Sequence, residues 1–169
     1  MILAFIVVVC IVIAIILVHM DTLDVRRKKA ALFYQFSQLG SRYGLSFTSQ
    51  ERLQQRIIGL DAMKRKILVF ELTDSPPDWY LINLDDVKGC AVKKVYGSID
   101  AGGLDKQRID GYLEIIALEF FFRDGAPTLA LPFYMKLQND VEEIPELDQK
   151  AKGWEVMLGK MLVRESKRA

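Results

Sequence analysis

The residue types that do chemistry in proteins are sparse in this sequence, and their positions do not favour catalysis. His19 is the only histidine, and it lies at the end of an apolar run. A Ser-His-Asp or Cys-His arrangement would have to be built around it, away from the rest of the chain. Cys10 and Cys90 lie in different predicted elements, and without a second histidine they predict no metal site. We therefore expect a protein without catalytic, metal-binding or cofactor-binding residues, and not an enzyme.

Two pairs of neighbouring carboxylates remain as acid-base candidates. Asp85 with Asp86, and Glu142 with Glu143, would serve as acid and base only if their surroundings separated the two pKa values. Neighbouring residues of a strand point to opposite faces, so we expect these carboxylates to be solvated turn and cap residues. The glycine-rich stretch 97–105 lacks the strand-to-helix context of a phosphate-binding loop, and we expect a plain loop there.

Basic residues are the remaining candidates for binding. If they converge on one side, that side would face anionic headgroups, where each Lys or Arg contributes roughly 1 kcal/mol. Lys88, Lys93 and Lys94 would join such a surface, and the alternative for all of these residues is scattered solvated charge. The candidate anionic-lipid contacts are Arg26, Arg27, Lys28, Lys29, Lys64, Arg65 and Lys66.

The first residues of the chain predict a membrane anchor. Residues 2–18 carry no polar side chain, and a helix over residues 1–20 would be about 30 Å long, the thickness of a bilayer core. A cleaved signal would need positive charge before the run, and a buried core helix would show a polar stripe. Four cations follow the run and none precedes it, so the bias toward cytoplasmic positive charge predicts an outside N-terminus and a cytoplasmic remainder. We therefore expect a single-pass protein of the cell inner membrane, although an outward-facing envelope domain stays an alternative.

The remaining sequence has the size and charge balance of one ordinary domain. The whole chain has 23 Lys and Arg against 22 Asp and Glu, so no basic excess favours nucleic-acid binding. Residues 21–44 predict a juxtamembrane helix with Leu32, Phe36, Leu39 and Tyr43 on one face. Residues 53–165 predict a cytosolic domain of six or seven antiparallel strands followed by a helix.

The strands are predicted from alternating apolar residues between turn signals. Gly89 predicts a kink, and Pro132 predicts an edge strand or a bulge because proline cannot donate to a sheet ladder. Phe120 and Phe121 point to opposite faces, so one of them needs cover from the juxtamembrane helix or from a partner. The fold class expected is α+β, a bent sheet or partial barrel closed by a C-terminal helix. The predicted strands are 57–61, 66–72, 79–84, 86–97, 112–122 and 128–135.

This order of elements resembles the pleckstrin-homology-like superfold, including its bacterial membrane-associated members. Trp154 matches the large aromatic residue that members carry in the closing helix. The resemblance implies headgroup contacts near the first hairpin, here Lys64, Arg65 and Lys66, although no further Arg follows along 67–72. In bacterial members it implies protein contact or assembly more than lipid recognition. The matching segments are hairpin 57–72, strand pair 79–96, hairpin 112–135 and helix 146–163.

These features together predict a membrane-anchored, non-enzymatic domain that binds or organises a protein partner at the inner membrane. Tethering raises the effective concentration of a weak binder near its partner without new contacts. Anionic-lipid binding and a membrane-surface enzyme with an unrecognised pocket are the alternatives. Cys10 and Ala14 have the small-xxx-small spacing that allows close helix pairing, which favours a homo-oligomer. The expected partners are thus the lipid bilayer, an unidentified protein and a second copy of the chain.

Overall fold

The computed structural model of the protein describes residues 30–71, 78–97 and 110–166. The predicted transmembrane helix 1–20, the cationic residues 26–29 and most of the predicted loop 97–105 lie outside the described residues. Among the helices that the model describes, none has the length and apolar character needed to cross a bilayer.

The described chain forms two antiparallel sheets and a C-terminal helix, which confirms the α+β class. The N-terminal sheet has the order β1-β2-β3-β4, with β1 (Ser49–Arg52), β2 (Arg56–Asp61), β3 (Lys66–Glu71) and β4 (Asp78–Asn83). The C-terminal sheet has the order β5-β6-β7, with β5 (Val87–Tyr96), β6 (Leu113–Phe122) and β7 (Leu129–Met135). A 3₁₀ turn, η2 (Val141–Glu143), leads into α2 (Ile144–Ser166).

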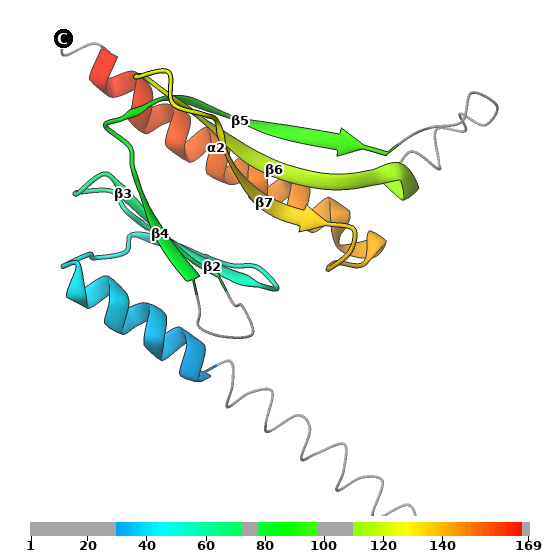
Figure 1. Cartoon of the computed structure of the whole chain (residues 1–169), viewed down its shortest axis with the longest axis horizontal. Coiled ribbons are helices and arrows are strands. Elements are labelled where there is room, and N and C mark those ends of the chain that lie inside the picture. The colour runs from blue at the N-terminus through cyan, green and yellow to red at the C-terminus, as the bar shows by residue number, and fades with distance from the viewer. Residues whose placement is uncertain (1–29, 72–77, 98–109, 167–169) are drawn as a thin grey trace, which may run out of the picture.

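The main core lies between the two sheets and α2. Ile58 and Leu60 of β2 reach this core together with Leu118 and Phe120 of β6. From α2, the predicted apolar stripe buries Trp154 against the sheets, where its exposed fraction is 4%. Figure 1 shows α2 running alongside the C-terminal sheet, and α2 contacts all three of its strands. The apolar face of α2 therefore packs against the C-terminal sheet and contributes to the core shared by the two sheets.

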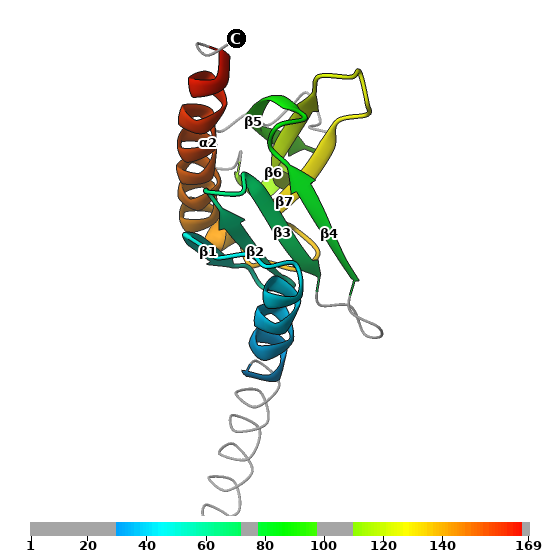
Figure 2. The same ribbon diagram turned by 90° about the vertical axis from the view of Figure 1, so that its left-hand side faces the viewer.

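The N-terminal sheet is covered on its second face by a helix over residues 30–42. Ile57, Leu68 and Phe70 alternate with the core residues and pack beneath Phe36 of this helix. Figures 1 and 2 show this helix on the side of the N-terminal sheet away from α2. Because both faces are covered, β2 is buried along its whole length. This double cover explains why residues 57–60, between the charged Arg56 and Asp61, carry no polar side chain.

Two irregular features were predicted from single residues and are confirmed. The ladder between β5 and β6 is shifted between Val87 and Gly89, where the kink was expected. β7 is an edge strand, and its ladder with β6 is shifted where Pro132 pairs with Ala117 and Tyr134 with Ile116. The extra residue, Phe133, reverses the alternation after the proline.

Three expectations about the strands need correction. Residues 79–96 were predicted as a strand pair, but β4 and β5 belong to different sheets. Simple alternation along the predicted strand 128–135 places Met135 on the inward face with Leu129, Leu131 and Phe133, but the bulge buries Tyr134 instead and leaves Met135 half-buried. β1 was not predicted and precedes the expected domain start at residue 53, because its sequence SQER carries no apolar alternation.

Candidate functional site

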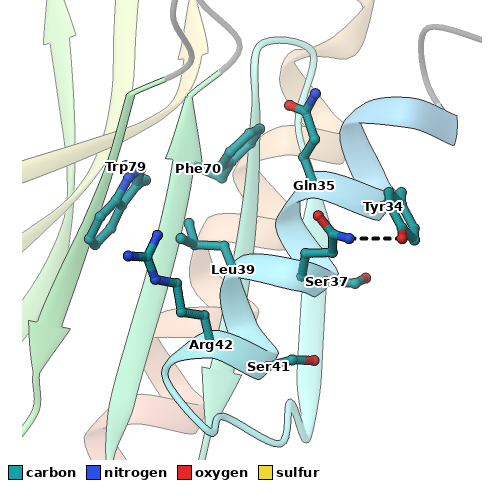
Figure 3. A pocket seen from close by; sticks show the side chains of 9 residues that line it. Tyr34, Gln35, Ser37, Leu39, Ser41, Arg42, Phe70 and Trp79 are labelled. Carbon is teal, nitrogen blue, oxygen red and sulfur yellow. Dashed lines mark hydrogen bonds between the residues drawn. The ribbon is translucent and has the colours of Figure 1, made fainter.

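A wide groove lies between helix 30–42 and the outer face of β3 and β4. Its volume is about 870 Å³. Leu39 and Phe70 supply its apolar surface, and Tyr34, Arg42 and Trp79 lie around them (Figure 3). Gln35, Ser37, Gln38 and Ser41 supply polar groups. Among the described residues that line the groove, Arg42 is the charged one, and none is a carboxylate, histidine or cysteine.

An aromatic cluster of Phe36, Phe47 and Phe70 holds the helix against the sheet. The Phe36 and Phe47 rings stack with centroids 4.7 Å apart, and Phe36 meets Phe70 edge-on at 6.4 Å. Gly40 and Gly59 make room for this cluster, because a Cβ at either position would lie 2.6 Å from the Phe47 ring. The two glycines thus set how closely helix 30–42 approaches β2.

Asp61 anchors the segment that joins the helix to the sheet. Its carboxylate accepts hydrogen bonds from the backbone N–H of Ser46 at 2.7 Å and of Lys64 at 2.8 Å. These bonds, the one from Lys64 first, hold the pKa of Asp61 below its ordinary value despite burial. Gly44 follows the helix in a left-handed conformation, with φ of 62°, which ends the helix before this segment. The conformation of Gly44 and the hydrogen bond from Ser46 to Asp61 therefore fix the connection that follows helix 30–42.

Exposed aromatic residues and one arginine form the rim of the groove. The rings of Tyr43 and Trp79 lie 5.1 Å apart, and Trp79 remains 38% exposed. On the helix side of the groove, Gln38 donates a hydrogen bond to the hydroxyl of Tyr34, one turn earlier in helix 30–42, at 2.8 Å (Figure 3). The exposed Arg42 extends toward Trp79 in the same view, and no described acidic side chain pairs with it. The guanidinium is therefore available to an incoming carboxylate.

The predicted headgroup contacts lie at the turn between β2 and β3, and two of them are engaged within the chain. The ammonium group of Lys64 donates a hydrogen bond to the carbonyl oxygen of Gly44. Arg65 forms an ion pair with Asp85 and donates to the carbonyl of Met161 in α2 at 3.3 Å. Lys66 begins β3 and is half-buried.

The other basic residues of the expected surface lie on β5. Lys93 pairs with Glu119 at 2.9 Å, and Lys94 pairs with Asp148 at 3.0 Å. Lys88, at the start of the same strand, is exposed. The first two are thus neutralised by neighbours within the chain, as expected of scattered surface charge.

The carboxylate pairs occupy the turn and cap positions that were predicted. Asp85 pairs with Arg65, and Asp86 accepts a hydrogen bond from the Asn83 side chain at 3.0 Å. Glu143 closes a capping box by accepting the backbone N–H of Asp140 at 3.0 Å. In the part of the chain that the model describes, no group of three metal-ligating side chains gathers.

Cys90 is the cysteine within the described residues, and its thiol is a weak nucleophile. It lies half-buried in β5. Burial, with a smaller contribution from the charge of Glu155, raises the pKa of the thiol to about 11. Because the thiolate is the reactive form, this group is almost wholly protonated at neutral pH.

The groove was not predicted from the sequence, although one of its signals was visible. The aromatic-rich stretch 33–36, FYQF, is typical of a buried core segment or of a contact surface. The structure divides it, because Phe36 is fully buried while Phe33 and Tyr34 are 44% and 63% exposed. Likewise Phe120 is buried and Phe121 is 39% exposed, and helix 30–42 covers the N-terminal sheet instead of Phe121.

Comparison of the chain with protein-family models, with curated proteins and with solved structures finds no match. Function must therefore be inferred from the chemistry of the groove and from the sequence that precedes it.

Proposed function

We propose that this protein is a single-pass inner-membrane protein whose cytoplasmic, pleckstrin-homology-like domain binds a partner protein and performs no catalysis. The apolar residues 2–18 and the cations after them support the anchor and its orientation. The division into four and three antiparallel strands with a closing helix supports the pleckstrin-homology-like fold. The fold alone does not specify a function, so the groove carries the functional part of the proposal.

The observation that carries the proposal is the groove beside helix 30–42. Trp79 and Arg42 are the residue types that most often dominate the energy of protein interfaces, and both are exposed there. Tyr34 adds a second exposed aromatic side chain on the opposite rim. A broad groove whose described lining has hydroxyl groups but no carboxylate, imidazole or thiol to activate them favours binding over catalysis.

Charge near the first hairpin favours a protein partner over a lipid headgroup. Lys64 and Arg65 already contact Gly44 and Asp85 within the chain. Binding a headgroup there would require replacing these contacts, whereas no acidic side chain of the described residues pairs with Arg42. The groove therefore combines the exposed guanidinium of Arg42 with exposed aromatic rings, which suits a protein partner.

The test is site-specific photocrosslinking of the full-length chain in native membranes. p-Benzoylphenylalanine replaces Tyr34 on the groove rim or, as a control, Leu137, which is 94% exposed beside β7. We expect a protein adduct from position 34 that is absent from position 137. Equal adducts from both positions, or lipid adducts alone at position 34, would refute partner binding in the groove.

A further inference from the structure

We propose, building on the protein-binding function above, that the partner contributes an extended acidic segment that adds as a new strand to the open edge of β4. The groove beside that edge then receives alternate side chains of the segment. The added strand carries a carboxylate that pairs with Arg42 and an apolar side chain that packs against Trp79.

β4 is an edge strand whose outward backbone groups can be assigned. Among the described residues it pairs with β3 alone. The N–H of Leu84 donates to the carbonyl of Arg65 at 2.9 Å, and Trp79 pairs with Phe70 in the same ladder. Alternate residues of an antiparallel strand direct their backbone groups to the neighbour and away from it. Trp79, Leu81 and Asn83 therefore present their N–H and carbonyl groups to the open edge.

One of these outward groups is already occupied. The N–H of Trp79 donates to the side chain of Asp78 at 2.8 Å, which agrees with its outward direction. No described group accepts the N–H of Leu81. The donor of Leu81 and the carbonyls of Trp79 and Leu81 are thus in place to bind an extended chain.

The remaining edges of the two sheets are engaged by other parts of the fold. β1 is tied to α2 by the ion pair between Glu51 and Lys150 at 3.3 Å. On the edge of β5, the N–H of Val92 donates to Glu155 of α2 at 3.0 Å. On β7, Pro132 has no N–H and its carbonyl accepts a hydrogen bond from Arg56. Natural sheets generally protect their edges by such devices, so an edge left open beside a groove favours strand addition.

The groove selects the chemistry of the added strand. Trp79 and Leu81 point to the sheet face that carries helix 30–42, where Leu81 packs partly against the aromatic cluster. Side chains two residues apart on an added strand would lie on this same face. One would contact the Trp79 ring, and an Asp or Glu would meet Arg42, whose planar guanidinium suits a carboxylate. The expected motif is an acidic and an apolar residue separated by one position.

The experiment selects peptides from a random display library on the full-length chain held in phosphatidylcholine nanodiscs. We expect enrichment of Asp or Glu two positions from an apolar residue. The charge-reversal variant Arg42→Glu should enrich Lys or Arg at the same position. Selected peptides that lack an Asp or Glu two positions from an apolar residue would overturn the assignment of partner chemistry. Selection of the same peptides by Arg42→Glu as by the wild-type chain would overturn it as well.

Strand addition is tested separately with a matched pair of variants. Leu81→Pro and Leu81→Ala both remove the leucine side chain, but only proline removes the outward N–H, and it leaves the β3–β4 ladder intact. We expect Leu81→Pro to weaken binding of a selected peptide about tenfold relative to Leu81→Ala. In the wild-type chain, the peptide should slow amide exchange at Leu81. Equal affinities for the two variants, or an unchanged exchange rate at Leu81, would overturn strand addition.

The outcomes separate this inference from the proposed function. A protein adduct at position 34 with no dependence on the Leu81 amide would refute strand addition and leave partner binding standing. Binding of the full-length chain to anionic vesicles that is lost in Arg42→Glu, with no peptide enriched, would refute both in favour of a membrane contact.

Discussion

Gly59 lies in β2 directly beneath two aromatic rings, and its replacement by alanine tests how helix 30–42 is held. A Cβ at this position would lie 2.6 Å from Cζ of Phe36 and 2.6 Å from the Phe47 ring. Ordinary contact begins near 3.4 Å, so the rings would have to retreat by roughly 0.8 Å. Phe36 is fully buried, and Phe47 is confined on its other side by Gly40. The strain must therefore move the helix.

Overpacking of this kind costs about 1–3 kcal/mol. Because the strain falls on the contact between helix and sheet, it should favour local detachment of helix 30–42 over global unfolding. That free energy corresponds to amide exchange about 5- to 150-fold faster in the helix. Exchange in α2 depends on the main core and should change little.

The assay is hydrogen exchange with mass spectrometry on the full-length chain. Gly153→Ala is the matched control, because no heavy atom lies within 4 Å of the added Cβ in that exposed helical position. The control should stabilise α2 by up to about 1 kcal/mol and leave helix 30–42 unchanged. Unchanged exchange of helix 30–42 in Gly59→Ala would refute the close-packing argument and, with it, the rigid groove wall.

Three further predictions concern the framework of the domain. Asp61 has a pKa below its ordinary value, so its charge stabilises the fold above about pH 4, and this contribution is lost as the pH falls through the folded pKa. Asp61→Asn should lower stability at pH 7 and flatten the fall of stability below about pH 4 in denaturant unfolding; an unaltered slope in that range would contradict this. In a Cys10→Ser background, Cys90 should react slowly with iodoacetamide at pH 7 and faster toward pH 11, and rapid reaction at pH 7 would disprove the raised pKa. Trp154→Ala should cost about 3–5 kcal/mol of unfolding free energy, and a loss below about 1 kcal/mol would exclude its place in the core.

Local patterns in the sequence predicted most of the elements. Short apolar or alternating stretches between turn signals identified the strands β2 to β7, and the apolar period of residues 147–162 identified α2. Pro132 alone predicted an edge strand or a bulge, because proline has no backbone N–H to donate to a sheet ladder. Such features depend on a few consecutive residues, which is why they are readable without the fold.

The features that were not predicted depend on residues far apart in the chain. β1 is polar and becomes a strand because β2 supplies its partner. Whether β4 pairs with β5 or ends its sheet is decided by packing across the main core, and turn residues alone do not show it. The groove requires Arg42, Phe70 and Trp79 to meet, and no local period connects these three positions. The basic turn had a local signal, but its contacts with Gly44 and Asp85 required the folded chain.

The central claim is that the groove beside helix 30–42 binds a partner protein through Arg42 and its aromatic rim. The most direct measurement compares photocrosslinking from position 34 in native membranes between the wild-type chain and Arg42→Glu, at equal expression. A protein adduct that the charge reversal reduces by about tenfold is the predicted result. An adduct of undiminished yield in Arg42→Glu, or the absence of any protein adduct from the wild-type chain, would contradict the claim.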